Sequence, residues 1–392
     1  MTEVGPAEGV VGADRLDLDG LFAALFSPGG IEDPHRLYRR YPGPEGRYAV
    51  AQKLLRDHRF GPADFSAERR PIWRMFGRWL INLDGREHDV TRALAADPFA
   101  RSMSARYVDV VSGHVERLLD GVEAAAGPVD LLTAVAYPLP VSVICTILGL
   151  PDEDRPAIDG WLRTLSLAFA RQRQEDMLLA GDAAVEGLTR YLGPILADRR
   201  AHPRDDLLSL IARDPTVAFD TVVANAIFVL VAGHDTTLSA LCSCVLLLLR
   251  HPDQLAAVRA DPSLVPGAVE EALRFESPVQ IAMRSAREDT EIDGFRFVAG
   301  APIRVLLGAA NRDPEVFPDP DRFDVTRQPN PHLSFTAGRH FCLGAPLARL
   351  QLVTALSAIL RRFPRIELAE EPRWLSAMPL RTLEGLVVSV AR

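Results

Sequence analysis

A single cysteine between two glycines is the residue of this chain best suited to chemistry. Cys342 lies between Gly338 and Gly344, and an apolar helix is expected to begin at Ala345, with Pro346 in its first turn, where proline is tolerated. Unpaired N–H groups and the positive end of the helix dipole favour a thiolate near a helix N-terminus. Glycine lets the backbone approach a flat, bulky group closely. The spacing therefore predicts a thiolate that faces a bound group; the alternative is a buried, inert cysteine.

A polar interruption in the longest apolar segment is the second candidate. Residues 221–249 are almost continuously apolar, but Gly233, His234, Asp235 and Thr236 interrupt them. Hydroxyls that bond to backbone carbonyls loosen a helix locally, and an acid beside a hydroxyl can relay protons. Polar groups are costly inside a bilayer, so the segment predicts a buried core helix. The alternative is a kinked helix with capped side chains. For His234, bonding to a neighbouring helix is favoured over lining a pocket or joining the relay.

A glutamate and an arginine one helical turn apart form the third candidate. Glu271 and Arg274 share a helix face, and residues 265–273 are largely apolar, which predicts that the pair faces inward. A bidentate guanidinium–carboxylate pair can satisfy its own buried donors. An exposed pair with this spacing would contribute little to stability, so the prediction depends on burial.

Together these motifs resemble those of the cytochrome P450 superfamily, of the soluble bacterial type. The family pattern Phe-Gly-x-Gly-x-His-x-Cys-x-Gly is matched at Phe335, Gly338, His340, Cys342 and Gly344. Thr336 stands where the family usually has glycine, which leaves the geometry of that turn open. The resemblance extends from about residue 83 to residue 392.

The resemblance implies a haem-thiolate enzyme and assigns residues to it. Cys342 would be the axial ligand of haem b (iron protoporphyrin IX), a ligand type that favours cleavage of the O–O bond. The residues implied to contact the cofactor are His88, Arg92, Arg284 and His340 at its propionates, with Ala232, Gly233, Phe335 and Gly344 beside it. Asp235 and Thr236 would supply protons during the use of O2. A structural triad for folding and haem retention would consist of Glu271, Arg274 and Arg322.

Helical periodicity dominates the chain. The expected helices span residues 87–96, 105–126, 131–148, 155–171, 178–200, 220–250, 252–261, 266–276 and 345–361. An Asp293-Gly294 turn predicts a hairpin over 290–297, and residues 302–307 and 385–390 also have an extended pattern. The sequence therefore predicts a mainly α protein with small β sheets. The resemblance adds the cytochrome P450 fold, a triangular helical prism with haem between the long central helix and the cysteine loop.

Composition limits the remaining possibilities. The 392 residues are 48% hydrophobic and 24% charged, without an evident linker or repeat, which favours one domain over residues 1–392. A net charge of −8 argues against a general nucleic-acid binder. Four cysteines without a CxxC pair, and an N-terminus without a basic or hydrophobic stretch, favour a cytoplasmic protein with no signal peptide or membrane anchor.

The segments that contact substrate in the family fall at residues 72–81, 165–173, 227–231, 278–283 and 375–382. Their apolar side chains are Ile81, Leu167, Phe169, Phe228, Val279, Ile281 and Met378, and the candidates for polar contacts are Arg171, Arg173 and Gln280. By analogy with the family, we expect hydroxylation or epoxidation of a moderately large hydrophobic molecule of polyketide or macrolide type. A terpene substrate and oxidative coupling of aromatic rings stay open.

Electrons must come from a separate protein, because the sequence contains no flavin or iron–sulfur motif. The resemblance implies ferredoxin and ferredoxin reductase as donors, docking on the thiolate side, where Arg92, Arg339 and Arg349 are candidates for a basic patch. The acid and hydroxyl at 235–236 argue against a peroxide-using relative. The remaining alternative is a non-catalytic haem-binding or scaffold protein, although the chain keeps the cysteine and the Glu271–Arg274 pair.

Overall fold

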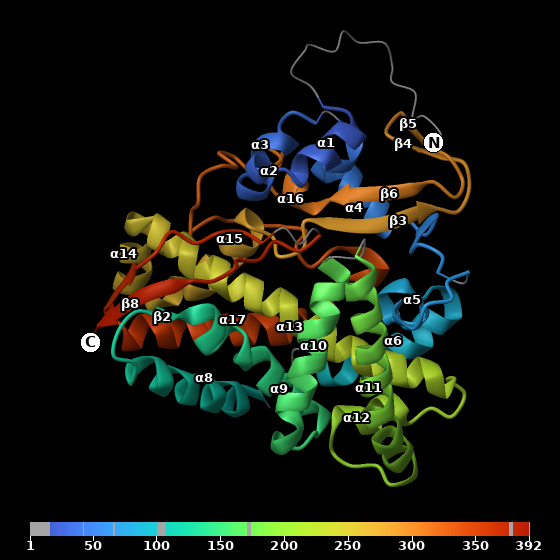
Figure 1. Cartoon of the computed structure of the whole chain (residues 1–392). Coiled ribbons are helices and arrows are strands. Elements are labelled where there is room, and N and C mark those ends of the chain that lie inside the picture. Colours follow the sequence, from blue (N-terminus) through green and yellow to red (C-terminus); the bar gives the residue numbers. More distant parts are fainter. Residues whose placement is uncertain are drawn as a thin grey trace. The chain divides into compact units, whose positions relative to one another are not determined.

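The computed structural model of the chain describes residues 16–41, 43–65, 67–99, 107–170, 174–375 and 379–391 (Figure 1). These residues form two compact units, each assembled from segments that are distant in the sequence. Unit 1 consists of the described parts of Met1–Ala63, Gly267–Cys342 and Arg373–Glu384, and unit 2 of those of Asp64–Pro266, Leu343–Pro372 and Gly385–Arg392. A single domain over the whole chain stays a prediction.

Unit 1 contains short helices and two small antiparallel sheets. Its helices are α1 (Leu18–Leu25), α2 (Pro28–Glu32), α3 (Pro34–Tyr38), α4 (Tyr48–Arg56), most of α15 (Val265–Phe275) and α16 (Leu307–Ala310). One sheet has the order β1 (Phe60–Gly61), β3 (Ile281–Ala286), β6 (Pro302–Leu306), with Phe60 opposite Ala286 and Ile281 opposite Leu306. The other is a hairpin of β4 (Thr290–Ile292) and β5 (Phe295–Phe297).

The predicted hairpin is confirmed, and its turn has the geometry that the sequence suggested. Asp293 and Gly294 have φ values of 51° and 82°. A two-residue turn with positive φ at both positions matches the twist of the strands that it joins, and Asp-Gly is one of the preferred pairs for it.

Apolar residues bury the β1-β3-β6 sheet of unit 1 against the N-terminal helices. Leu21 and Leu25 of α1 form one cluster with Ile281 and Leu306. A second cluster joins Tyr48 and Leu54 of α4 to Phe60, Val305 and Phe317. Figure 1 shows the blue helices α1 to α4 beside the orange strands β3 and β6. These contacts hold strand β3 and helix α4 close to the loop that carries Cys342.

Unit 2 is mainly helical. Its helices are α5 (Pro71–Gly77), α6 (Gly85–Phe99), α8 (Val108–Glu123), α9 (Pro138–Leu148), α10 (Arg155–Ala170), α11 (Glu175–Ala201), α12 (Leu207–Ala212), α13 (Phe219–Arg250), α14 (Pro252–Ala260) and α17 (Ala345–Arg362). One sheet pairs β2 (Val129–Asp130), β8 (Val387–Ala391) and β7 (Arg365–Leu368) in that order.

Helix α13 is the predicted apolar helix, and it is the centre of unit 2. It contacts α9, α10, α11, α12, α14 and α17. Among the described residues it is the one helix long and apolar enough to cross a membrane, but 67% of its most apolar window is buried inside the structure. Burial of this extent favours the predicted core helix, because a helix that is apolar all round needs neighbours on every side.

The mainly α fold class is confirmed, with helix ends within a few residues of those predicted. One difference lies at 131–148, where a π-helical turn (Leu132–Ala136) precedes α9 and α9 itself begins at Pro138. Proline has no N–H to continue a helix but is tolerated in the first turn. The sequence also missed the short helices α1 to α5, which are stabilised by packing because isolated segments of this length are marginal helices.

A buried ion pair anchors the segment 373–384 within unit 1. Arg381 Nε donates to Glu276 Oε2 at 3.0 Å, Nη2 donates to Glu32 O at 2.9 Å, and the guanidinium lies 3.6 Å from the centre of the Trp374 ring. Burial raises the pKa of Glu276, but the charges of Arg381 and His35 outweigh burial and hold it well below its ordinary value of 4.5. The ionised form of Glu276 is therefore the one that stabilises the fold.

We expect Glu276→Gln to lower the free energy of unfolding at pH 7 by about 3–5 kcal/mol, because Arg381 stays buried without its carboxylate. The depressed pKa means that folded Glu276 binds fewer protons than unfolded Glu276, so its contribution is present above pH 4.5 and is lost as the pH falls. Denaturant unfolding between pH 7 and pH 3 should show a shallower acid loss for the variant. Glu291→Gln, at an exposed position of β4, is the control. Parallel pH curves for Glu276→Gln and the unaltered chain would contradict the prediction.

Candidate active site

The segment that carries Cys342 is a tight loop of unit 1. The carbonyl of buried Phe335 accepts a hydrogen bond from Cys342 N at 2.9 Å, and the 3₁₀ turn η7 (Gly338–His340) lies between them. Cys342 is half-buried. As predicted, α17 begins three residues later, with Gly344 as its N-cap and a proline in its first turn. In the sequence, the loop therefore places the cysteine immediately before the N-terminus of a helix.

Thr336 adopts the backbone conformation that glycine would take at the same position. Its φ is 60°, in the left-handed region that a β-branched residue rarely adopts. The Thr336 hydroxyl donates a hydrogen bond to His340 O at 2.8 Å. This bond closes the turn across η7, so the loop geometry is kept although the glycine of the family pattern is absent.

Gly338 is required by the close approach of helix α4 in unit 1. Its φ is 70°, and a Cβ placed there would lie 2.6 Å from Leu55 O and 2.8 Å from Arg56 Cα. Both distances are far inside van der Waals contact. The C-terminal end of α4 thus packs directly on the cysteine loop, and any side chain at position 338 would push the two apart.

The predicted pair Glu271 and Arg274 is completely buried in α15, and every donor of the guanidinium is used. Arg274 Nε and Nη2 donate to the two Glu271 oxygens, both at 2.8 Å. Nη1 donates to Asn311 O and Pro320 O, both at 2.9 Å, and Nη2 also donates to Arg322 O at 3.2 Å. With all five N–H groups paired, the cost of burying the charge is offset. The predicted inward orientation is confirmed.

The prediction that Arg322 completes the triad is wrong; the arginine that reaches the carboxylate is Arg327. Arg327 Nε donates to Glu271 Oε1 at 3.1 Å, whereas Arg322 is exposed and contributes only its backbone carbonyl. Asp324 N and Asn330 Nδ2 also donate to Glu271, at 3.0 and 3.1 Å. Residues 320–330 curve around the buried carboxylate, so the path of the chain decides which arginine reaches it.

Asn311 connects the buried pair to the cysteine loop. Its carbonyl accepts from Arg274, its Oδ1 accepts from Leu333 N at 2.7 Å, and its Nδ2 donates to Ser334 Oγ at 2.8 Å. Ser334 Oγ in turn donates to Leu273 O of α15 at 2.7 Å. The residues immediately before Phe335 are therefore fixed to the helix that carries the Glu271–Arg274 pair.

Arg284 of strand β3 is a buried cation without a carboxylate partner among the described residues. The side chain donates Nη1 to Met283 O at 2.8 Å, and the residue is 5% exposed. Burial lowers the pKa of Arg284 to about 10. An unpaired buried charge is costly, and a haem propionate is an anion that would offset this cost. Arg284 therefore fits its predicted role, and His340 and Cys342 belong to the same unit.

Helix α13 carries the predicted acid and hydroxyl in unit 2. Thr236 Oγ1 donates to Ala232 O at 3.0 Å, as expected for a hydroxyl that bonds back into its own helix. Asp235 Oδ2 accepts a hydrogen bond from Ser166 Oγ of α10 at 2.5 Å. The segment stays helical through 232–237, so the predicted local loosening is not present. Ser166 lies in the predicted substrate segment 165–173, but the sequence did not indicate a contact with Asp235.

His234 packs against a neighbouring aromatic ring. It is buried, and its ring meets Tyr137 edge-on with centroids 4.4 Å apart. Its Nδ1 lies 2.8 Å from Asp235 Oδ1, but neither ring nitrogen has the geometry of a hydrogen bond. Arg163 covers the Tyr137 ring at 3.7 Å, and burial raises the pKa of Tyr137. The ring therefore has a packing role, but the predicted bond to a neighbouring helix is not found among the described residues.

Helix α6 places His88 and Arg92 one turn apart, as predicted. His88 is fully buried, with Nδ1 3.3 Å from Asp89 Oδ1, and Arg92 is half-buried. The predicted cofactor and proton-relay residues of unit 2 are His88, Arg92, Ala232, Gly233, Asp235, Thr236 and Gly344, and those of unit 1 are Arg284, Phe335, His340 and Cys342. Their assembly around one cofactor stays a prediction.

Three of the predicted substrate segments meet in an aromatic cluster of unit 2. Phe169 of α10 contacts Trp73 and Phe76 of α5 and Trp79 just beyond it, with centroid distances of 5.8, 5.5 and 5.5 Å. Trp79 also contacts Phe228 of α13 at 5.2 Å. Phe169 and Phe228 were predicted. The other three were missed, although aromatic residues at i, i+3 and i+6 mark one face of a helix.

The remaining predicted substrate residues divide into exposed, buried and undescribed positions. Ile81 and Leu167 are 44% and 43% exposed, and Val279 is half-buried against the core of unit 1. The prediction for Ile281 is wrong, because this residue packs into the core cluster with α1 and is 5% exposed. Met378, Arg171 and Arg173 lie outside the described residues.

The prediction that Gln280 makes a polar contact with substrate is also wrong. Gln280 is fully buried. Its Oε1 accepts from Tyr38 OH at 3.0 Å and its Nε2 donates to Ser277 O at 2.8 Å. Both ends of the amide are thus used inside unit 1, where they tie α3 to the segment before β3.

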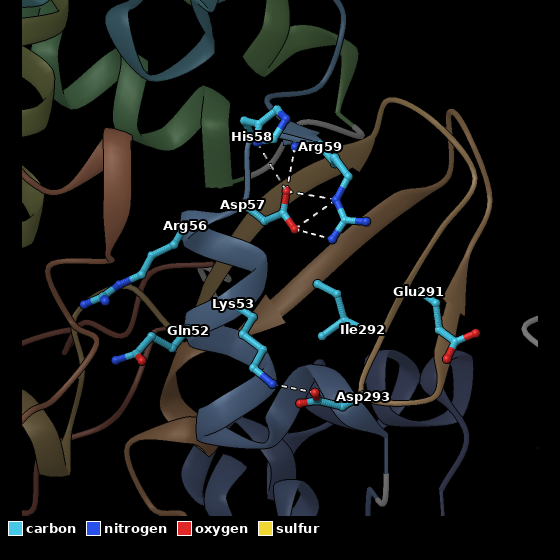
Figure 2. A pocket seen from close by; sticks show the side chains of 9 residues that line it. All are labelled: Gln52, Lys53, Arg56, Asp57, His58, Arg59, Glu291, Ile292 and Asp293. Atoms are coloured by element: carbon cyan, nitrogen blue, oxygen red, sulfur yellow. Dashed lines mark hydrogen bonds and ion pairs between the residues drawn. The ribbon is translucent and has the colours of Figure 1, made fainter.

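An open pocket of unit 1 lies at the C-terminal end of α4 (Figure 2). The Lys53 ammonium pairs with Asp293 of the hairpin, and Arg59 pairs with Asp57, whose pKa is lowered chiefly by that hydrogen bond. These two pairs neutralise their own charges, and Arg56, His58 and Glu291 also line the pocket. Arg56, which lines the pocket, packs against Gly338, so the pocket lies on a charged surface beside the cysteine loop.

Replacement of Arg327 and Arg322 by alanine should have unequal effects. Arg327→Ala removes a charge-assisted hydrogen bond to a buried carboxylate, and we expect a loss of about 1.5–3 kcal/mol in the free energy of unfolding. Arg322→Ala keeps the backbone carbonyl that Arg274 uses, so a change within about 0.5 kcal/mol is expected. Urea denaturation of both variants measures the difference. A larger loss for Arg322→Ala would restore the sequence-based triad.

The hydroxyl of Thr336 should contribute to the stability of the folded chain. Thr336→Val keeps a branched residue at positive φ without the bond to His340, and we expect a loss of about 1–3 kcal/mol in the free energy of unfolding. Thr336→Gly loses the same bond but adopts positive φ without strain, so it should stay within about 1 kcal/mol of the unaltered chain. Thermal unfolding compares the pair, and equal stability of the valine variant and the unaltered chain would count against this role.

Comparisons with known proteins agree with the geometry. The family model described as Cytochrome P450 matches residues 195–379. The 6-deoxyerythronolide B hydroxylase of Saccharopolyspora erythraea is 38% identical over 317 residues, which are 79% of this chain and 74% of that protein. The crystal structure of P450BioI in complex with hexadec-9Z-enoic acid ligated acyl carrier protein matches with a TM-score of 0.87, at 32% identity, over 92% of this chain and 99% of that one.

A second solved structure extends the likeness. The cytochrome P450 PksS of the Bacillus subtilis 168 bacillaene polyketide synthase matches with a TM-score of 0.81, at 32% identity, over 88% of this chain and 89% of that one. The two structures thus match this chain over about nine tenths of its length. The chain therefore belongs to the cytochrome P450 family, with its fold, and is a monooxygenase.

Proposed function

We propose that this monooxygenase binds haem b through Cys342 and hydroxylates or epoxidises a moderately large hydrophobic molecule of polyketide or macrolide type. Family membership implies a haem-thiolate cofactor. The observation that carries the substrate class is the aromatic cluster of unit 2, in which side chains from α5, α10 and α13 offer a broad apolar surface. Such a surface suits a large apolar body better than a small polar one.

Two relatives support the same class. One is named for hydroxylation of 6-deoxyerythronolide B, and another belongs to a polyketide synthase system. The exposed Ile81 and Leu167 extend the apolar surface with aliphatic groups. A third relative was solved with an acyl chain attached to a carrier protein, so a carrier-tethered substrate is the second candidate.

Each group of predicted site residues has a separate proposed role in the reaction. Bound haem, ligated by Cys342, would activate dioxygen for attack on an unreactive C–H or C=C bond. Arg284, with His88, Arg92 and His340, would hold the propionates. Asp235 and Thr236 would hold and pass on the two protons needed to form water from one oxygen atom. The Glu271–Arg274–Arg327 network keeps the cysteine loop in place.

Electrons are proposed to come from an acidic ferredoxin and its reductase in the cytoplasm. The cationic candidates are Arg92, Arg339 and Arg349, and the position of Arg56 against Gly338 adds a cation beside the loop. Opposite charge on the partner would raise the rate of encounter even for a chain with net charge −8.

A titration of the ferric protein tests the substrate class. The absorption spectrum is followed while macrolactones, terpenes, fatty acids, aromatic peptides and carrier-bound acyl chains are added. We expect a low-to-high-spin shift with macrolactones, because a compound bound beside the haem would displace water from the iron. A shift confined to terpenes or aromatic peptides would refute the polyketide proposal, and one confined to carrier-bound chains would favour the second candidate.

Asp235→Asn and Thr236→Ala should each slow product formation by about 100-fold or more, since positioned proton donors contribute roughly this much. Substrate affinity, measured by the spin shift, should be unchanged because binding needs no proton. Ser239→Ala is the matched control, as Ser239 Oγ also bonds back to its helix, at Asp235 O, 2.8 Å away. Product formation at the unaltered rate in both variants would rule out this proton route.

A further inference from the structure

We propose that Ser166 is a positioning residue for the Asp235 carboxylate, and that the proton route requires its hydroxyl. The proposal rests on the proposed role of Asp235. It concerns an interhelical contact between α10 and α13, both within unit 2. Ser166 lies in the predicted substrate segment 165–173, but the sequence gives no reason to prefer it to Thr164, the other hydroxyl residue of α10.

The contact is a short, charge-assisted hydrogen bond. Ser166 Oγ lies 2.5 Å from Asp235 Oδ2, across 69 positions of the sequence. Hydrogen bonds from a hydroxyl to a carboxylate are among the shortest and strongest in proteins. The Asp235 side chain is 17% exposed, so water competes weakly for the same oxygen. Among the described residues, this is the one hydrogen bond of good geometry that the carboxylate accepts.

The other carboxylate oxygen, Asp235 Oδ1, has neighbours that do not fix its position by a hydrogen bond. His234 Nδ1 is 2.8 Å from Asp235 Oδ1 but is poorly aligned for a hydrogen bond. The His234 ring is packed edge-on against Tyr137, and the Arg163 guanidinium lies over the Tyr137 ring. These rings limit where the carboxylate can lie without holding it, and Ser166 supplies the directional bond.

The consequence is a fixed orientation for the acid next to Thr236. A carboxylate has a broad, roughly two-fold terminal torsion, so without a donor at Oδ2 it can turn away from the relay. With Oδ2 bound to Ser166, the acid keeps one orientation relative to the Thr236 hydroxyl on the same helix. Preorganised groups of this kind lower the cost of proton transfer because nothing has to reorient during the step.

A purely structural role is the alternative, since a bond between α10 and α13 also joins two helices. The two roles differ in what the substitution changes. A structural contact would affect folding and substrate affinity whatever residue stands at 235, whereas a positioning residue acts only through the carboxylate. A pair of substitutions that share one function is non-additive.

The experiment compares Ser166→Ala and Ser166→Thr, each alone and combined with Asp235→Asn. Thr164→Ala is the matched control, because Thr164 is on the same helix and its hydroxyl donates to Gly160 O at 2.8 Å. The first readout is the infrared carboxylate band of Asp235 in the resting protein, identified by its loss in Asp235→Asn. We expect this band to shift in Ser166→Ala and to keep its position in Ser166→Thr and Thr164→Ala.

The second readout is turnover with the compound of the titration panel that gives the largest spin shift, with ferredoxin and reductase supplied. Ser166→Ala should form product about 10-fold more slowly, with more hydrogen peroxide released and an unchanged midpoint of the spin shift. Ser166→Thr should restore the rate, and Ser166→Ala should have no further effect in the Asp235→Asn background.

The outcomes separate this inference from the proposed function. If Asp235→Asn turns over at the unaltered rate, the inference falls together with the proposed role of Asp235, while the proposed substrate class is tested separately by the spin-shift titration. If Asp235→Asn is impaired while Ser166→Ala is not, only the inference is overturned. An unchanged infrared band, or an equal loss from Ser166→Ala in both backgrounds, would likewise leave Ser166 as a packing contact.

Discussion

The buried pair of Glu271 and Arg274 is the interaction on which the cysteine loop depends. A guanidinium in a dry interior must place all five donors, and here two go to the carboxylate and three to backbone carbonyls of residues 311, 320 and 322. The pair therefore fixes the course of a long irregular segment that has little secondary structure of its own. Asn311 transmits this order to the residues just before Phe335.

Steric and conformational constraints hold the loop in addition to the apolar core cluster, to which Leu333 and Ala337 belong. Helix α4 approaches so closely that only glycine fits at position 338, and Thr336 adopts positive φ with its hydroxyl bonded across the turn. A thiolate ligand benefits from such rigidity, because the position of the sulfur is set before the cofactor binds. In the same unit, Arg284 is buried without a carboxylate partner among the described residues, which is the basis for its proposed contact with a propionate.

Unit 2 combines an apolar framework with a small polar centre. Helix α13 is surrounded by other helices, yet it carries an acid and a hydroxyl whose bonds are specific: Thr236 to its own helix and Asp235 to Ser166. Polar groups inside an apolar helix are tolerated when each has a partner. The aromatic cluster of α5, α10 and α13 adds apolar side chains to the same unit, and our proposal assigns them to substrate binding.

The sequence by itself determined the features that are local along the chain. Glycine and proline spacing located the cysteine loop and the start of α17, periodicity located most helices, and three-residue spacing placed Glu271 beside Arg274. Only the tertiary structure decided that Arg327 rather than Arg322 reaches Glu271, that Ile281 and Gln280 are internal, and that Ser166 holds Asp235. The physical reason is that such contacts depend on how distant segments are packed, which residue spacing does not encode.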